Sequence, residues 1–253
     1  MQKPFIFLII LIALLGCNSK EIDREARAKR LLAMTLEEYN TEEFFKSTVT
    51  FNMGELEYKM VRDGVITDFE VTRQVDSLTY KAVYKNGYRA YLINDSIQAE
   101  TSYSNLFIDI RLEGIMYFFT LPREFDRNYV HLKQLEDVII KKKTYHAVHV
   151  SFTRVSEDDP EDELILYIDP DTNHIKYFAE FHQFTAAKKN VFKVAHNFRR
   201  IDSLLFADYY VLVPRKEDQN EKLDDLYKLY NANNMDELPS LIFENIEVER
   251  TKN

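Results

Sequence analysis

Tryptophan is absent from this 253-residue chain, glycine occurs only five times and cysteine only once. A glycine-rich phosphate loop needs several glycines close together, so nucleotide binding through such a loop is excluded. One cysteine cannot form an internal disulfide, so stability must come from packed side chains. The Gly-x-Ser-x-Gly and His-Glu-x-x-His motifs of hydrolases are missing too. These absences favour a protein that is not an enzyme; an unrecognised hydrolase or metal-dependent activity is the weaker alternative.

The charge balance is acidic and the hydrophobic content is high. The chain has 42 acidic and 33 basic residues, and 45% of its residues are hydrophobic, including 18 phenylalanines and 16 tyrosines. An acidic surface repels the phosphates of nucleic acids and of anionic lipid headgroups, so we expect no nucleic-acid partner. The aromatic content can supply a sizeable core, and a chain of this length can form a single β-rich domain.

The N-terminus carries the clearest functional signal. Residues Phe5 to Leu15 form an unbroken apolar run, which is shorter than the roughly 17–25 residues of a membrane-spanning helix and matches a signal-peptide core. The sequence Leu14-Leu15-Gly16-Cys17 that follows resembles the bacterial lipobox. That resemblance implies a signal peptide over residues 1–16, acylation of Cys17 and a lipidated tether over residues 17–20. An ordinary secretory signal with a chance cysteine is the alternative.

The same resemblance bears on the cellular location. Two or three acyl chains on Cys17 would hold the mature protein firmly on a membrane, because one chain alone binds only marginally. Asn18 follows the cysteine, where lipoproteins retained at the inner membrane carry aspartate. The resemblance therefore implies an outer-membrane lipoprotein of the cell envelope, facing either the periplasm or the cell surface.

Behind the tether, the sequence predicts a single α+β domain over residues 21–253. Asp63-Gly64 and Asn86-Gly87 are typical of two-residue hairpin turns, which indicates antiparallel strands. Helices are expected over 21–40, over the mostly apolar segment 103–121 that Pro122 ends, and over 220–230. About eleven strands are expected, over residues 56–62, 65–73, 78–85, 88–93, 138–141, 144–154, 164–168, 174–184, 191–200, 204–213 and 242–248.

The order of these elements resembles the half-barrel of lipoprotein carriers of the LolA and LolB type. Ile139–Phe152, Tyr167–Tyr177 and Val194–Asn197 resemble more closely an uncharacterised family of Gram-negative envelope lipoproteins. The resemblance implies one antiparallel sheet curved into a half-barrel, with helices packed on its concave face, and it brings no catalytic residues and no cofactor. Lys142 and Ala186-Ala187 stand at turn positions where such proteins tend to carry glycine.

Two functions of different classes follow. The first is a membrane-anchored lipoprotein that binds a lipid or another apolar ligand in the half-barrel cavity. Its expected lining consists of Tyr58, Met60, Tyr80, Tyr84 and Phe118, because tyrosine rings face apolar ligands while their hydroxyls reach water. The alternative is an anchored structural or interaction scaffold whose core is filled and which binds no small molecule.

A metal site is the remaining chemical possibility. Glu180 and His182 share one face of a predicted strand, and His196 lies on the next strand along the chain. Two histidines and a carboxylate are a common zinc ligand set. Cross-strand polar pairing explains the same residues, and we favour it, so no metal is expected.

Overall fold

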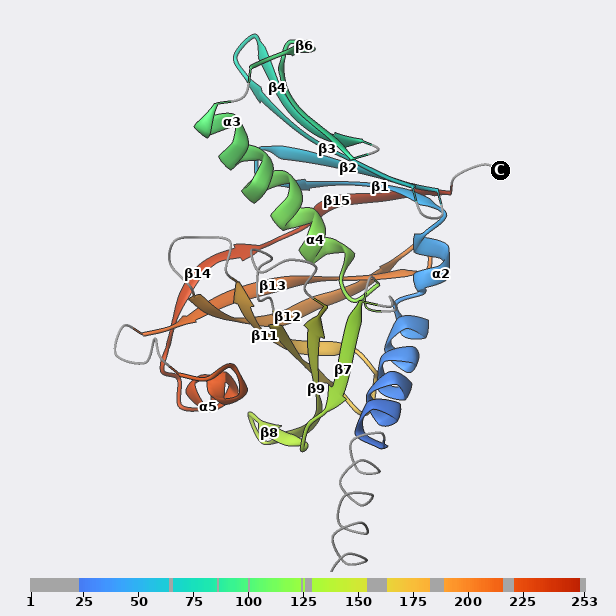
Figure 1. Cartoon of the computed structure of the whole chain (residues 1–253), viewed down its shortest axis with the longest axis vertical. Coiled ribbons are helices and arrows are strands. Elements are labelled where there is room, and N and C mark those ends of the chain that lie inside the picture. Colours follow the sequence, from blue (N-terminus) through green and yellow to red (C-terminus); the bar gives the residue numbers. More distant parts are fainter. Residues whose placement is uncertain are drawn as a thin grey trace, which may run out of the picture. The chain divides into compact units, whose positions relative to one another are not determined.

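A computed structural model gives the structure of the chain (Figure 1). It describes residues 23–63, 66–85, 87–99, 101–123, 125, 129–153, 163–182, 189–215 and 221–250. The predicted signal peptide, Cys17, the tether and Ala186-Ala187 lie outside these residues. The expectation of one domain over 21–253 also stays a prediction.

Antiparallel strands dominate the structure, as the hairpin signals predicted. They form two sheets, however, and not the single sheet of about eleven strands that we expected. The first sheet has seven strands in the order β15-β1-β2-β3-β4-β5-β6. Its strands are β1 (Ser47–Met53), β2 (Leu56–Asp63), β3 (Ile66–Val75), β4 (Leu78–Lys85), β5 (Tyr88–Ile93), β6 (Ser96–Ile97) and β15 (Glu244–Arg250).

The second sheet has eight strands. Seven of them follow the order β14-β13-β12-β11-β10-β9-β7, and β8 pairs with β9 off this path. Its strands are β7 (Val130–Gln134), β8 (Val138–Ile140), β9 (Lys143–Phe152), β10 (Glu163–Ile168), β11 (Ile175–His182), β12 (Lys189–Ile201), β13 (Leu204–Pro214) and β14 (Met235–Leu241).

Four strands were not predicted from the sequence, and all of them except β1 lie at a sheet edge. They are β1, β6, β7 and β14. Strand β6 has only two residues, which is too short for a pattern. Strand β14 contains Pro239, which cannot donate to a strand ladder and is tolerated at an edge. Hairpin signals identify neighbouring strands, but they do not show where one sheet ends and another begins.

The chain divides into two compact units. Unit 1 comprises residues 1–35, 126–194 and 211–238, and unit 2 comprises residues 36–125, 195–210 and 239–253. The division falls inside the N-terminal helix (residues 23–38) and inside strands β12, β13 and β14. The other helical elements are α2 (Thr41–Phe44), α3 (Ser102–Phe107), η1 (Ile108–Gly114), α4 (Ile115–Thr120), η3 (Leu223–Asp225) and α5 (Leu226–Asn231).

In unit 2, one helical run crosses a face of the seven-stranded sheet (Figure 1). It comprises α3, η1 and α4, which confirms the helix predicted over 103–121. Thr101 caps its start, since the Thr101 hydroxyl accepts from the Ser104 backbone N–H and the Ser104 hydroxyl accepts from the Thr101 N–H. The middle segment, η1, has π-helical hydrogen bonding, a geometry frequent at functional sites.

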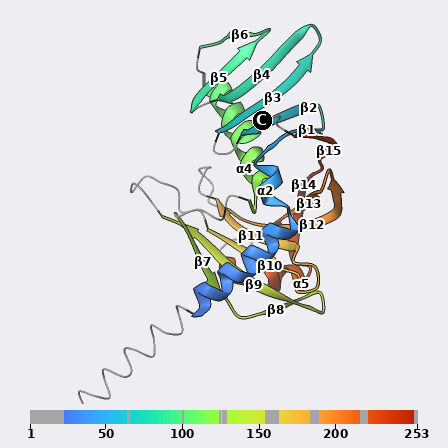
Figure 2. The same ribbon diagram turned by 90° about the vertical axis from the view of Figure 1, so that its right-hand side faces the viewer.

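In unit 1, both faces of the eight-stranded sheet are covered. Helix α5 lies on one side of it and the N-terminal helix lies on the other (Figures 1 and 2). Under α5, Tyr167, Tyr177 and Phe192 form an aromatic core with Leu226. Five consecutive residues of β10, from Leu164 to Ile168, are buried, as expected for a strand covered on both faces.

No helix within the described part of the chain is both long and apolar enough to cross a membrane.

Candidate ligand-binding site

The strand register of unit 2 places the four predicted strand residues on one face of the sheet. Tyr58 lies opposite Val71, which lies opposite Ala82, and Met60 lies opposite Phe69, which lies opposite Tyr84. Residues directly opposite in neighbouring strands share a face, and so do residues two apart in one strand. Tyr58, Met60, Tyr80 and Tyr84 therefore lie on the same side.

This is the face that the helical run covers. Phe51 of β1 lies opposite Tyr58 in the register, and the two rings stack with centroids 4.8 Å apart. Phe119 of α4 stacks on Phe51 at 4.2 Å. The predicted packing of the apolar helix against a sheet face is thus confirmed for α4.

Burial separates the predicted lining residues into two kinds. Tyr58 and Met60 have no exposed surface. The Tyr58 hydroxyl has no hydrogen-bond partner within the described residues, and burial raises the pKa of this tyrosine. Tyr80 and Tyr84 are half-buried. Phe118 belongs to α4, but its side chain is outside the described part of the structure. Tyr58 and Met60 therefore belong to the core and do not line an accessible cavity.

At the α4 end, unit 2 is packed solid. Besides Phe51, the Phe119 ring contacts Phe206 at 5.5 Å and Phe243 at 5.1 Å between centroids. The space left there measures about 10 Å³, which is room for one water. It is lined by Tyr39, Phe119, Leu121, Arg123, Leu205, Phe206, Ala207, Tyr209 and Phe243.

A buried cation lies in this packed region. Arg123 is 2% exposed, and its Nη2 donates to the Leu205 carbonyl at 3.0 Å. Its guanidinium lies 4.1 Å from the centroid of the Phe44 ring, a cation–π contact. Burial lowers the pKa of Arg123 to about 10. The contacts fasten the segment that follows α4 to the aromatic core.

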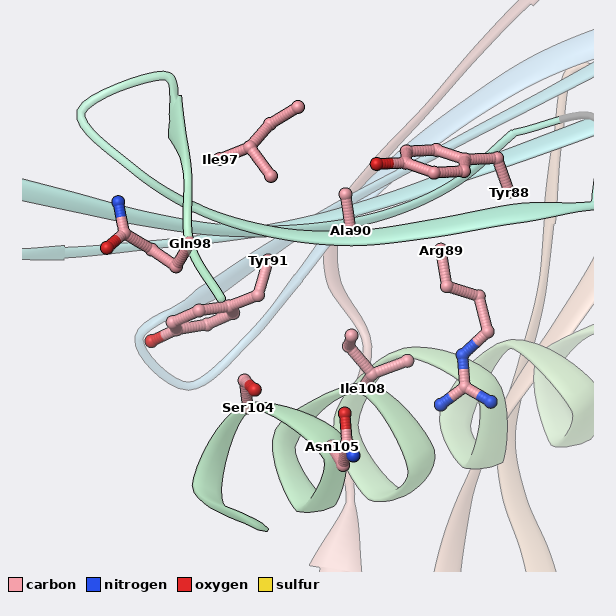
Figure 3. A pocket seen from close by; sticks show the side chains of 9 residues that line it. All are labelled: Tyr88, Arg89, Ala90, Tyr91, Ile97, Gln98, Ser104, Asn105 and Ile108. Carbon is pink, nitrogen blue, oxygen red and sulfur yellow. The ribbon is translucent and has the colours of Figure 1, made fainter. Parts of the chain in front are cut away.

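At the α3 end, the helical run leaves a cavity of about 330 Å³ beside strands β5 and β6 (Figure 3). It is lined by Tyr88, Arg89, Ala90, Tyr91, Ile97, Gln98, Ser104, Asn105 and Ile108. None of the predicted site residues is among them. The volume lies near the lower end of the range for small-molecule sites.

The walls of this cavity combine apolar and polar groups. Arg89 and Tyr91 point from β5 toward the helix, where Asn105 and Ile108 face them (Figure 3). The Tyr91 ring meets Phe107 edge-on at 5.7 Å between centroids. An aromatic ring and an aliphatic side chain on the walls, with a guanidinium and an amide beside them, suit a molecule that has both an apolar and a polar part.

The cavity opens at the edge of the sheet. Strand β6 pairs with only Leu92 and Ile93 of β5, and the Gln98 N–H extends this contact to the Tyr91 carbonyl. The rim residues Tyr88 and Ile97 project from the side of β5 and β6 that faces away from the helical run (Figure 3), and they are 58% and 65% exposed. Sequence reasoning missed the site because β6 is too short to predict and because α3 begins beside it only in the folded chain.

The register does not support the metal alternative. Glu180 pairs with Val191, which is five residues from His196 along β12, or about 17 Å at strand spacing. Glu180 is buried and forms an ion pair with Lys193. His196 stacks on Tyr210 at 3.9 Å between centroids. The side chain of His182 lies outside the part of the chain that the structure describes. Across the described residues, no group of three His, Cys, Asp or Glu could hold a metal ion.

Comparison with known proteins gives one family match. The model of a family described as "Family of unknown function (DUF6503)" matches residues 3–242. Among curated proteins, none matches this chain.

Two solved structures show a distant similarity to this chain. A domain of an outer membrane lipoprotein-sorting protein from Vibrio parahaemolyticus is 8% identical with a TM-score of 0.43, over 81% of this chain and 98% of that one. A DUF1329 family protein from Desulfovibrio piger ATCC 29098 is 9% identical with a TM-score of 0.42, over 87% of this chain and 92% of that one.

Proposed function

The chain belongs to DUF6503, a family of unknown function, and we propose a function from its own residues. We propose that it is an envelope lipoprotein that binds a single amphiphilic molecule in the cavity between β5, β6 and the α3 end of the helical run. The cavity of about 330 Å³ carries this proposal. The apolar part of the ligand would lie against Tyr91 and Ile108, and its polar part would meet Arg89 and Asn105. This extends the predicted lipid ligand to one with a polar group.

The contrast between the two ends of the helical run supports this location. Around Phe119 the rings lie 4.2 to 5.5 Å apart and leave about 10 Å³. A ligand has no room there. Beside α3 the same sheet face is hollow, and the cavity rim is open to solvent. The ligand site therefore lies at the edge of the sheet and not at Tyr58 and Met60, in the buried middle of its face.

The alternative function is the anchored scaffold without a small-molecule ligand. The dense aromatic packing around Phe119 favours it, because this part of the sheet face is already filled by the chain itself. If the protein is such a scaffold, the open rim beside Tyr88 and Ile97 would be an ordinary part of the surface that binds no ligand. Ligand titration separates the two functions.

The absence of tryptophan makes that titration direct. Tyr88→Trp places a unique fluorophore on the cavity rim, and Tyr129→Trp places one at a 50% exposed site in unit 1 as a matched control. Dodecanoate should change the Tyr88→Trp emission saturably and leave the Tyr129→Trp emission unchanged. Adding Asn105→Phe, which fills the cavity, should abolish the change while the circular dichroism spectrum is retained.

The outcomes are distinct. No saturable change at tens of micromolar would leave the scaffold function in place. Equal changes from both fluorophores would indicate adsorption of dodecanoate to the surface.

Membrane anchoring through Cys17 is the second part of the proposal, and its support is the Leu14-Leu15-Gly16-Cys17 sequence. Cys17→Ser removes the acylated thiol, so the variant should no longer fractionate with membranes. An outer-membrane location, supported by Asn18, predicts that the wild-type protein sediments with outer-membrane markers on a sucrose gradient. Unchanged processing and sedimentation of Cys17→Ser would refute the anchor.

A further inference from the structure

The β8–β9 hairpin of unit 1 carries an apolar side chain, that of Ile139, which is not packed into the core of the protein. Ile139 is 62% exposed, while its neighbour Ile140 is fully buried. The turn of the hairpin consists of Lys141 and Lys142, both exposed. An exposed isoleucine beside exposed lysines is a pattern of surfaces that lie at a membrane interface, where aliphatic groups enter the bilayer boundary and cations meet phosphates.

Contacts with α5 hold the hairpin in this conformation. The Asn231 side chain donates to the Ile139 carbonyl at 2.8 Å and accepts from the Lys141 N–H at 2.8 Å. The Lys141 ammonium donates to the Asn233 side chain at 2.6 Å and lies 4.8 Å from the centroid of the Tyr230 ring. Ile139 is thus presented on a fixed support, so membrane insertion would need little further ordering.

Lys141 and Lys142 make the tip of the hairpin locally positive. Asp169 and Asp171, in the neighbouring β10–β11 turn, both pair with the Lys143 ammonium at 2.7 Å. Lys142 makes no ion pair within the described residues. The chain as a whole has a net charge of −9, which opposes general adsorption to anionic lipid. A membrane contact is therefore confined to a local surface such as this one.

The N-terminal helix begins at the same end of unit 1. Figures 1 and 2 both show its first turn and β8 at this end. Arg24, in that first turn, pairs with Glu136 at 3.0 Å, and Glu136 stands three residues before Ile139. From Cys17 to residue 23, the first described residue of the helix, there are six residue steps, which span at most about 20 Å in any conformation. Phe152, at the far end of β9, lies nine residue steps from Lys143 at the hairpin end of the strand. It is therefore about 30 Å from the hairpin along the strand.

We infer that the β8–β9 hairpin is a second membrane contact, in which Ile139 enters the interface of the phospholipid bilayer that holds the acylated Cys17 and Lys142 meets its phosphates. The inference rests on the proposed Cys17 anchor. It orients unit 1, because the β8 end then faces the membrane and the Tyr129 end of the sheet faces away. Tyr129 precedes β7, whose first residue, Val130, pairs with Phe152 at the far end of β9.

The experiment uses the single cysteine of the chain. Once Cys17 is acylated, Ile139→Cys supplies the only free thiol, and Tyr129→Cys supplies the matched control at a 50% exposed position. Each lipidated full-length variant is labelled with an environment-sensitive nitrobenzoxadiazole dye. It is then reconstituted into vesicles of phosphatidylethanolamine and phosphatidylglycerol that contain spin-labelled lipid. Circular dichroism verifies that both variants are folded.

We expect a blue-shifted, lipid-quenched emission from position 139 and an unshifted, unquenched emission from position 129. Adding Lys142→Glu should reduce the quenching at position 139, because it replaces attraction to phosphate by repulsion. Protein that floats with the vesicles but is quenched equally at both positions would overturn the hairpin contact and leave the anchor intact. Protein that does not float at all would refute the Cys17 anchor, and the hairpin inference with it.

Discussion

Replacing Phe119 by alanine tests whether α4 fixes the helical run to the sheet of unit 2. Phe119 is 6% exposed and contacts Phe51, Phe206 and Phe243 at 4.2, 5.5 and 5.1 Å between centroids. Truncating a buried phenylalanine costs about 3–5 kcal/mol, and aromatic pairs contribute about 0.5–1.5 kcal/mol each beyond their buried area. Three such pairs put the expected loss in the free energy of unfolding at about 4–5 kcal/mol.

The measurement is urea unfolding followed by circular dichroism and by tyrosine fluorescence, since the chain has 16 tyrosines and no tryptophan. Amide hydrogen exchange in β1 and β2 shows whether the loss arises in unit 2. Ile108→Ala is the control from the cavity end of the same helical run. Ile108 is 4% exposed and already borders the 330 Å³ cavity. Its truncation should cost about 2 kcal/mol, at the low end for isoleucine, because little new cavity is created.

The order of the two losses is the decisive result. If Phe119→Ala lowers the free energy of unfolding by less than about 1 kcal/mol, the aromatic cluster does not hold the helical run. If Ile108→Ala costs as much as Phe119→Ala, the α3 end is packed as tightly as the α4 end. Either result would contradict the contrast on which the proposed ligand site rests.

Two further predictions concern unit 1. Lys142 has a φ of +72°, which costs a side-chain residue about 1–2 kcal/mol. Glycine loses more backbone entropy on folding, but Lys142→Gly should still raise the free energy of unfolding by about 0.5–1 kcal/mol. The control Lys59→Gly, in the extended strand β2, should lower the free energy of unfolding. A destabilised Lys142→Gly variant would refute backbone strain at Lys142. Burial raises the pKa of Asp169, but hydrogen bonds from Lys143 and from the Asp171 N–H outweigh it, so the pKa lies below its usual value. Its stabilisation is therefore present above the unfolded pKa of about 3.9 and is lost as pH falls through the lower folded pKa; the melting-temperature advantage over Asp169→Asn should shrink below about pH 4, and a constant advantage would contradict it.

The sequence predicted those parts of the fold that local chemistry determines. Asn86-Gly87 predicted a hairpin, and Lys85 of β4 pairs with Tyr88 of β5 across that turn. The resemblance marked Lys142 as standing where such proteins tend to carry glycine, and its φ is positive. The apolar segment 103–121 predicted a helix packed on a sheet face, which Phe119 confirms. The resemblance to an uncharacterised family is confirmed by the family match over residues 3–242.

The candidate site depended on long-range geometry and could not be predicted in the same way. Alternation placed Tyr80 and Tyr84 on one face, and the register adds Tyr58 and Met60 to it. Alternation does not tell which part of a face a helix fills, however. Phe51 and Phe119 bury Tyr58, while the cavity opens beside β6, a strand of two residues. The number of sheets was wrong for a related reason, because hairpin signals identify neighbouring strands but do not show where one sheet ends and another begins.

The two proposed functions place different demands on the helical run. A scaffold gains stability from every contact along the helix. A cavity under one end removes packing contacts and serves no purpose in a scaffold. A ligand-binding protein needs one end fixed, so that the cavity keeps its shape, and the other end open, so that the ligand can enter. Phe119 and Arg123 fix the α4 end, whereas Arg89, Asn105 and Ile108 face an open space at the α3 end. The π-helical segment η1 lies between them, where the helix departs from regular geometry at the boundary of packed and hollow regions. This division along one helix is the physical reason to prefer ligand binding over the scaffold.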